Sequence, residues 1–211
     1  MITVWGRATS SNVQKVMWAV GELGLPHERI DVGGPHGGLN DPAFRAINPH
    51  GLIPAVRLGD GVTMFESSAI VRTLAARDPA RTLWPGGGQA EADAHMWMEW
   101  AQLSVSSVIT TLFWAVVRTK PAERDKRRIA ELTAQVAAGL DAAAKRMGPA
   151  PHLVGERLTI ADIALGHTLY RWMTMEVDRP ENPTIEAYYA RLTARPAFAT
   201  HVMVDYSSLR A

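Results

Sequence analysis

The sequence predicts an α/β module followed by an all-helical part. Three observations support this organisation. Short stretches rich in β-branched residues alternate with helical stretches over residues 1–78, a segment rich in proline and glycine covers residues 79–88, and residues 89–211 have helical spacing throughout. With 211 residues, of which 47% are hydrophobic and 20% charged, the chain has enough apolar side chains for a globular core.

The module begins with a strand, a helix and a second strand. Ile2–Arg7 has the β-branched and aromatic residues of a strand, and His27–Val32 alternates as a second strand does. Between them apolar residues recur every third or fourth position, which defines one helical face, and Gly24 and Pro26 end the helix. The residues of this face are Val13, Val16, Met17, Val20 and Leu23. This order predicts a βαβ unit with a right-handed crossover.

A glycine-rich loop and a short helix, Pro42–Ile47, lead to a predicted hairpin. Its strands are Ile53–Leu58 and Val62–Glu66, and the Gly-Asp-Gly between them is a typical hairpin turn. A helix follows over Ser67–Asp78, with a serine as its N-cap. The first predicted domain, residues 1–78, therefore has the element order β-α-β-α-β-β-α.

After the linker at residues 79–88, the rest of the chain is the second predicted domain and consists of helices. Ala90–Arg118 forms one long helix or two stacked pieces. Thr159 and Asp162 have the spacing of a capping box, and two short helices at 184–194 and 196–202 follow. The core face of the helix that precedes the capping box consists of Ile129, Leu132, Val136, Leu140 and Met147.

Composition and charge exclude several classes of function. The formal net charge is +1, and the densest basic cluster, Ala122–Glu131, alternates with acidic residues as a solvated helix face does, so we expect no nucleic-acid partner. The absence of cysteine removes disulfides, thiolate metal sites and a cysteine nucleophile. There is no metal-binding motif, no run of about 18 apolar residues and no signal-peptide pattern. We therefore expect a cytoplasmic protein without a metal or a membrane partner.

The loop between the first strand and the first helix contains adjacent polar residues that are candidates for chemistry. Ser11 and Gln14 fit the S-x-x-Q capping box, which gives Ser11 a structural explanation. Ser10 and Asn12 are less easily explained as caps. If thiol chemistry takes place at this loop, the ligand must bring the sulfur, because the chain has no cysteine.

Three motifs, in the right order and spacing, resemble the cytosolic glutathione transferase family over essentially the whole chain. "NPHGLIPAV" is similar to the NPxGxxPxL-like element of the family, "FESSAIVRTLA" to its E/Q-S-x-A-I-x-x-Y-L element, and "LTIADIALG" to its helix-capping motif. The resemblance implies a thioredoxin-like N-terminal domain, an all-helical C-terminal domain, glutathione as substrate and a homodimer. Within the family, the first loop looks like those of bacterial theta- or nu-like members.

The resemblance assigns roles to residues of the second and third motifs. It implies a cis bond before Pro54, which exposes the backbone N–H and C=O of Ile53 to an extended tripeptide. Glu66 and Ser67 fall on the family's site for the γ-glutamyl end, where Ser67 at a helix N-terminus holds the carboxylate and Glu66 the ammonium.

The contact for the glycine end of glutathione stays open. Many relatives have a basic residue where this chain has Leu52, and the nearby candidates are His50 and His36. A second departure is Thr73, where the family commonly has tyrosine. These departures keep open a non-catalytic ligand- or protein-binding member of the fold, whereas the Glu66-Ser67 pair favours an enzyme.

The resemblance also ranks the residues of the first loop as thiol activators. Ser10 falls on the catalytic serine of theta- and delta-type enzymes, and Ser10 and Asn12 fall on the threonine and asparagine of nu-like enzymes. The order of candidates is Ser10, Asn12 and then Ser11. Lowering a thiol pKa from about 8.5 to about 6.5 requires roughly 2.7 kcal/mol, and one or two hydrogen bonds to the thiolate can supply that.

The electrophile is expected to lie against the first long helix of the second domain. Its aromatic residues form the candidate apolar pocket, namely Trp97, Trp100, Phe113 and Trp114. The expected activity is conjugation of the glutathione thiolate to hydrophobic electrophiles, as in detoxification. The alternative activity is a glutathione-dependent reduction of disulfides or peroxides, as nu-like members carry out.

Overall fold

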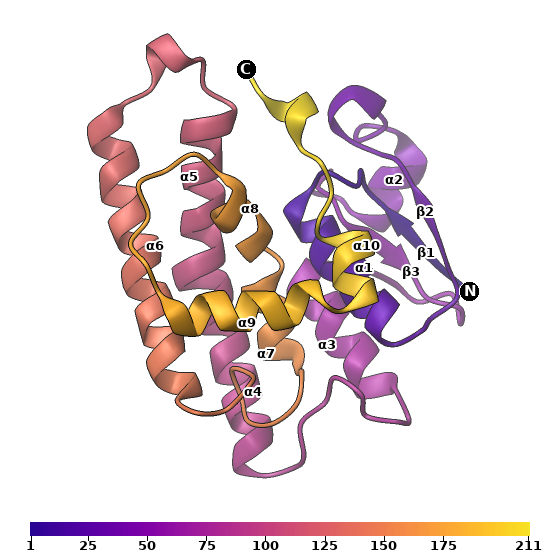
Figure 1. Cartoon of the computed structure of the whole chain (residues 1–211). Helices are drawn as coiled ribbons and strands as arrows, with labels where there is room; N and C mark the ends of the chain where they lie inside the picture. Colours follow the sequence, from indigo (N-terminus) through magenta and orange to yellow (C-terminus); the bar gives the residue numbers. More distant parts are fainter. The chain divides into compact units, whose positions relative to one another are not determined.

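The computed structural model of the chain describes residues 1–211 and consists of two compact units (Figure 1). The first unit contains Met1–Trp84 and Ala197–Val204, and the second contains Pro85–Pro196 and Asp205–Ala211. The chain therefore enters the first unit twice, first with its N-terminal 84 residues and again shortly before its end.

A four-stranded mixed sheet forms the centre of the first unit. The strands are β1 (Ile2–Trp5), β2 (His27–Ile30), β3 (Ala55–Arg57) and β4 (Thr63–Phe65), in the order β2-β1-β3-β4. β1 pairs in parallel with β2, and the pairs β1–β3 and β3–β4 are antiparallel. This is the predicted thioredoxin-like arrangement, with strands that are shorter than the sequence pattern indicated.

The helices of the first unit pack through their buried apolar residues. Residues Val13–Val20 of α1 (Ser11–Glu22) are all buried, and α1 packs on α3 (Ser67–Arg77). Phe44 of α2 (Pro42–Ile47) joins a small cluster with Val32 and Ala55, close to the short helix η1 (Gly34–His36) in the preceding loop.

The last α-helix, α10 (Pro196–His201), contributes to the first unit, which the sequence pattern did not indicate. Phe198 is fully buried, and its ring meets Trp18 of α1 edge-on at 4.9 Å between centroids. Gly21 of α1 provides the space for this contact, since a Cβ there would come within 2.9 Å of Ala197 Cβ. The predicted all-helical domain included these residues, so the structure differs from that boundary.

The second unit is entirely helical. Its first helices, α4 (Gln89–Trp100), the π-helical η2 (Ala101–Ser106) and α5 (Ser107–Val117), form one continuous stretch, in agreement with the predicted long helix. The remaining elements are η3 (Pro121–Glu123), α6 (Lys126–Met147), α7 (Ile160–Gly166), α8 (Leu169–Thr174), α9 (Pro183–Thr193) and η4 (Ser207–Leu209).

The stretch Gln89–Val117 is long and apolar enough to cross a membrane when only length and composition are considered. The sequence pattern did not indicate such a stretch, because polar residues interrupt its apolar ones. Core helices of water-soluble proteins meet the same criterion. Here Ile109 and Leu112 are fully buried, and α5 packs on α6.

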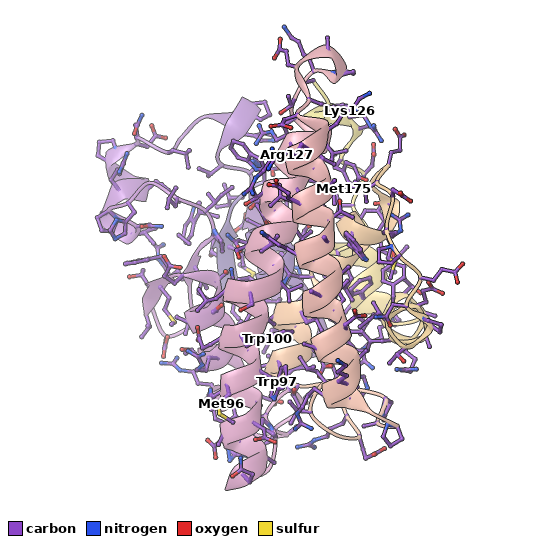
Figure 2. The ribbon with its side chains drawn as sticks, turned by 90° about the vertical axis from the view of Figure 1, so that its left-hand side faces the viewer. Met96, Trp97, Trp100, Lys126, Arg127 and Met175 are labelled. Carbon is purple, nitrogen blue, oxygen red and sulfur yellow. The ribbon has the colours of Figure 1, made fainter.

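Helix α6 confirms most of the predicted core face, and its charged N-terminal end is exposed. Ile129 is the exception, being only partly buried, while the other four predicted positions lie in the core. Figure 2 shows Lys126 and Arg127 at the start of this helix, where Arg127 pairs with Glu131 at 3.1 Å. The basic cluster is thus the solvated helix face that was predicted.

Candidate functional site

The loop before α1 holds Ser10 with a free hydroxyl. Ser10 is the N-cap residue, and its backbone carbonyl accepts from the Gln14 N–H at 2.9 Å, but its side chain makes no capping hydrogen bond. The predicted capping box of Ser11 and Gln14 is wrong, because Gln14 Nε2 donates to the Ala8 carbonyl at 3.0 Å instead. The Ser10 hydroxyl is therefore available to donate a hydrogen bond to a ligand.

Asn12 and Ser67 join this loop to the start of α3, although 55 positions separate them in the sequence. The Ser67 hydroxyl donates to Asn12 Oδ1 at 3.3 Å. Since the carbonyl oxygen of the Asn12 amide is used in this contact, its NH₂ group remains to donate to a ligand. The asparagine side chain is exposed and Ser67 is buried, so the pair has a solvent-facing side.

Glu66 has an unusual backbone conformation at the start of α3. Its φ is +66°, which is rare for a residue other than glycine and costs on the order of 1–3 kcal/mol. Glu66 is also the N-cap of α3, so the predicted serine cap is wrong and Ser67 is the first helical residue. The exposed Glu66 carboxylate therefore lies directly before the 11-residue helix α3. The free N–H groups at the start of this helix favour the binding of an anion.

The bond between Ile53 and Pro54 is cis, which confirms the prediction. Pro54 is buried, and β3 begins at the next residue. The backbone N–H and C=O of Ile53 have no partner in the chain, because the ladder with β4 starts at Ala55 and the nearby Asn48 Nδ2 donates to the Leu52 carbonyl at 2.8 Å. An extended peptide can pair with these two free groups.

The two candidate histidines for the glycine carboxylate have different surroundings. His36 Nε2 lies 4.0 Å from Asp31 Oδ1, and the hydrogen bond from Arg29 lowers the pKa of Asp31, so an anion already occupies its neighbourhood. His50 is exposed and meets the Phe65 ring edge-on at 5.4 Å. His50 thus lies beside an aromatic ring, whereas His36 lies beside an acidic side chain.

Arg45 and Gly51 fix the loop that carries His50. The Arg45 guanidinium donates to the Pro49 carbonyl and to Asn40 Oδ1, both at 2.7 Å. Gly51 has φ +63°, and a Cβ at this position would lie 2.5 Å from Arg45 Cζ. The backbone conformation therefore favours glycine at this position of "NPHGLIP", and a larger residue would displace the Arg45 guanidinium.

The four aromatic residues predicted for the electrophile pocket lie in three different environments of the second unit. Trp97 and Trp100 of α4 are partly buried and contact each other edge-on at 4.8 Å, as Figure 2 allows the reader to follow. Phe113 is a core residue, packed against Tyr206 and under the Arg171 guanidinium. Trp114 is exposed, with Arg118 stacked 4.6 Å from its centroid. Burial gives Phe113 a structural role.

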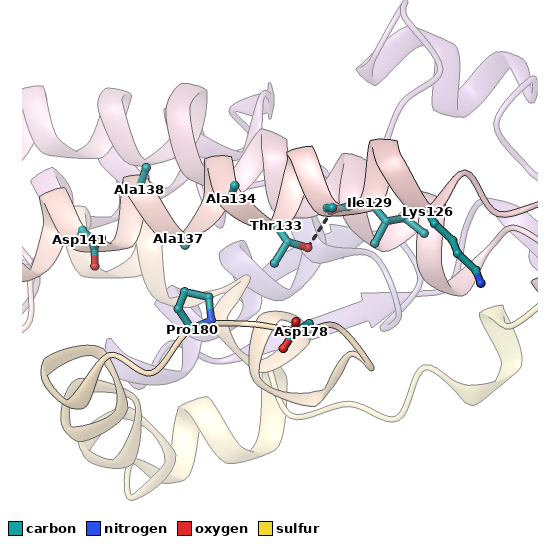
Figure 3. Close-up of a pocket in the computed structure, with 10 residues that line it drawn as sticks. Lys126, Ile129, Thr133, Ala134, Ala137, Ala138, Asp141, Asp178 and Pro180 are labelled. Atoms are coloured by element: carbon teal, nitrogen blue, oxygen red, sulfur yellow. Dashed lines mark hydrogen bonds between the residues drawn. The ribbon is translucent and has the colours of Figure 1, made fainter.

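A cavity of about 550 Å³ in the second unit has a different character from the candidate site (Figure 3). It lies along α6 beside Asp178 and Pro180, and the Thr133 hydroxyl is occupied by the Ile129 carbonyl at 2.8 Å. Its wall combines four alanines with the charged residues Lys126, Asp141 and Asp178. None of the residues predicted for the glutathione site lines this cavity.

Comparison with known proteins identifies the family. Residues 9–77 match the family model "Glutathione S-transferase, N-terminal domain", and residues 126–191 match "Glutathione S-transferase, C-terminal domain". Glutathione S-transferase GstB of Escherichia coli K12 is 34% identical over 98% of this chain and 100% of its own length. Glutathione S-transferase 3 of Zea mays is 31% identical over 93% of this chain and 91% of its own length.

A solved structure supports the same family assignment. A theta class glutathione S-transferase from Xanthomonas axonopodis pv. citri, determined with glutathione bound, superposes with a TM-score of 0.90 at 43% identity, covering 97% of this chain and 98% of the other. The chain belongs to the glutathione S-transferase family. These matches confirm the family resemblance and the two-part fold that the sequence predicted, and they identify the chain as a transferase.

One residue of this glutathione S-transferase was missed by the sequence analysis, although a signal was present. Lys15 is the only charged residue within the buried stretch Val13–Val20 of α1. It is fully buried, and its Nζ donates to Ser68 Oγ at 3.0 Å. A charge on an otherwise apolar helix face is unusual and points to a specific partner.

Proposed function

We propose that this protein conjugates glutathione to hydrophobic electrophiles. The contact between Asn12 and Ser67 carries the proposal, because it brings the loop with the free Ser10 hydroxyl to the N-terminus of α3. A tripeptide that pairs with Ile53 and places its γ-glutamyl carboxylate at the N–H groups of α3 then has its thiol within the region of the first loop. The family membership and the relatives named above support glutathione as this tripeptide.

The chemical step requires a thiolate rather than a thiol. Ser10 and Asn12 donate hydrogen bonds to the sulfur and stabilise its anionic form, and the thiol proton leaves to solvent. The sulfur then forms a bond to the electrophilic carbon, and the leaving group departs with the electron pair of its bond. Neither side chain has to ionise for this role. His50 is assigned to the glycine carboxylate, and Trp97 and Trp100 are assigned to the electrophile.

Calorimetry with glutathione, combined with the thiolate absorbance of the bound ligand against pH, tests this proposal. The wild type is expected to bind with a thiol pKa below about 8.5. Ser10→Ala or Asn12→Ala, whichever residue contacts the sulfur, should raise that pKa by about one to two units, because a hydrogen bond to a charged group contributes roughly 1.5–3 kcal/mol. Ser11→Ala, the third candidate, should change the pKa least of the three variants. A wild type that does not bind glutathione contradicts the proposal.

We also propose that the protein forms a homodimer. Exposed apolar side chains follow the stretch α4–η2–α5, with Met96 55%, Leu103 69% and Trp114 57% exposed. Apolar side chains clustered on one surface often mark a protein–protein interface. Light scattering coupled to gel filtration measures the mass directly. A mass near twice 23.0 kDa supports the dimer, and a mass near 23.0 kDa at all concentrations contradicts it.

A further inference from the structure

We propose that Lys15 is a positioning residue, which holds the first turn of α3 against the first turn of α1 and so keeps the glutathione site in register with the thiol-activating loop. This inference rests on the proposed function and deepens it. Two hydrogen bonds cross between the helices at adjacent positions, from Ser67 to Asn12 at 3.3 Å and from Lys15 to Ser68 at 3.0 Å.

The spacing along α1 explains why these two contacts act together. Asn12 and Lys15 are three residues apart and therefore share one face of the helix. Their partners, Ser67 and Ser68, are the first two residues of α3. The contact through Asn12 is exposed on one side, whereas Lys15 is fully buried. The ammonium of Lys15 is therefore shielded from water, whereas its partner Ser68 is partly exposed.

Packing alone does not explain a lysine at position 15. A buried ammonium is costly unless it is paired with hydrogen-bond acceptors, and an apolar residue would fill the same volume without that cost. The Ser68 hydroxyl is such an acceptor, and it lies in the helical turn whose N–H groups would receive the γ-glutamyl carboxylate. A cation beneath this turn adds to the positive potential of the helix N-terminus, which favours both the carboxylate and a nearby thiolate.

Ser68 is the route by which Lys15 acts. Ser67 is buried at the proposed ligand site, and Ser68 follows it in the backbone. A bond that fixes Ser68 therefore fixes the orientation of the N–H groups at Ser67 and Ser68. Glu66, at φ +66°, precedes this turn, and a strained residue of this kind keeps its conformation only when its surroundings hold it.

The test compares four variants of the full-length protein: Lys15→Met, Lys15→Arg, Ser68→Ala and, as a control for the loss of one positive charge, the exposed Lys126→Met. For each, calorimetry measures the dissociation constant for glutathione, thiolate absorbance measures the pKa of the bound thiol, and thermal melting measures stability. Lys15→Met is expected to weaken glutathione binding about tenfold and to raise the thiol pKa by roughly half a unit or more.

The other variants separate position from charge. Ser68→Ala removes the hydroxyl acceptor in the first turn of α3 but keeps the ammonium, so it should weaken binding with a smaller change in thiol pKa. Lys15→Arg keeps both the charge and the donor and should restore most of the binding lost in Lys15→Met. Lys126→Met should match the wild type in both readouts, because it lies on the exposed start of α6.

The outcomes distinguish this inference from the proposed function. If the wild type binds glutathione but Lys15→Met and Ser68→Ala change only the melting temperature, Lys15 has a merely structural role and the inference is overturned. If Lys15→Met does not fold, an unchanged affinity in Ser68→Ala overturns it as well. If the wild type itself does not bind glutathione, the proposed function fails, and the inference fails with it.

Discussion

At the scale of single residues, Gly51 shows how a loop can be fixed by one side chain. An alanine there meets a backbone at φ +63° and the Arg45 guanidinium, whose bonds to Pro49 and Asn40 hold the loop of His50. We predict that Gly51→Ala weakens glutathione binding about tenfold. The new methyl group displaces the Arg45 guanidinium, and this displacement shifts the loop that precedes Ile53. Calorimetry with glutathione measures this change.

Gly24→Ala is the matched control for that variant. Gly24 has a similar φ of +60°, and a Cβ there would have no atom within 4 Å. Both variants should therefore lose stability from the backbone, on the order of 1–2 kcal/mol. Only Gly51→Ala should lose affinity for glutathione. Equal losses of affinity in the two variants would contradict the role given to Arg45.

The sequence could name individual site residues but not the contacts between them. Ser10, Asn12 and Ser67 could be predicted from short local motifs, because the residues of each motif lie within a few positions of one another. The bond between Asn12 and Ser67 joins positions 55 apart, and only the packing of α1 on α3 creates it. Lys15 was missed for the same reason, because its partner Ser68 is 53 positions away.

At the scale of secondary-structure elements, the capping box at the start of α7 confirms a sequence prediction and extends it. The Thr159 side chain accepts from the helix while Asp162 accepts from the Thr159 N–H at 2.8 Å. Asp162 is fully buried and also accepts from the Leu153 N–H and the Tyr188 hydroxyl, each at 2.9 Å. The box therefore ties α7 to α9 as well as starting a helix.

Tyr188→Phe is predicted to lower the free energy of unfolding by about 1.5–3 kcal/mol at pH 7, the value of a hydrogen bond to a charged group. Burial raises the pKa of Tyr188 well above 10, and the charge of Asp162 adds to this effect. Because the folded state holds the proton more tightly, the contribution is complete below about pH 10 and is lost as the pH rises above it. The variant should lose stability less steeply in that alkaline range than the wild type.

Chemical denaturation at pH 7 and at two alkaline pH values measures both effects. Tyr170→Phe is the control, since burial also raises the pKa of Tyr170 while its hydroxyl has no hydrogen-bond partner in the chain. This control should cost little at pH 7. A loss at pH 7 that is the same in both variants would show that the bond to Asp162 contributes nothing of its own.

Element boundaries were the part of the fold that sequence patterns described least well. β1 and β2 are each two residues shorter than predicted, although Gly6 and Arg7 still donate to Ile30 and Val32 beyond their ends. The serine cap of α3 was wrong because Glu66 occupies that place at positive φ. Local patterns report which residues are apolar, whereas strand ends and caps depend on where neighbouring segments stop.

At the scale of the whole molecule, the chain returns to its first unit after completing most of the second. Helical spacing identified α10 as a helix, but spacing does not reveal which core a helix joins. Trp18 and Phe198, 180 positions apart, are both fully buried and in edge-to-face contact. Val202 is also fully buried in the same segment. The stability of the first unit therefore depends on residues near the end of the chain.

Phe198→Ala is predicted to destabilise the first unit by about 3–5 kcal/mol, the range for removing a fully buried phenylalanine. The loss should be confined to the first unit, because α10 belongs to it. Hydrogen exchange measured by mass spectrometry resolves this: the amides of α1, where Trp18 lies, should exchange faster, and those of α6 should not. Phe198→Leu, which fills much of the same volume, should restore most of the protection. Equal acceleration in α1 and α6 would mean that the two units unfold together, and that α10 supports the whole chain instead of the first unit alone.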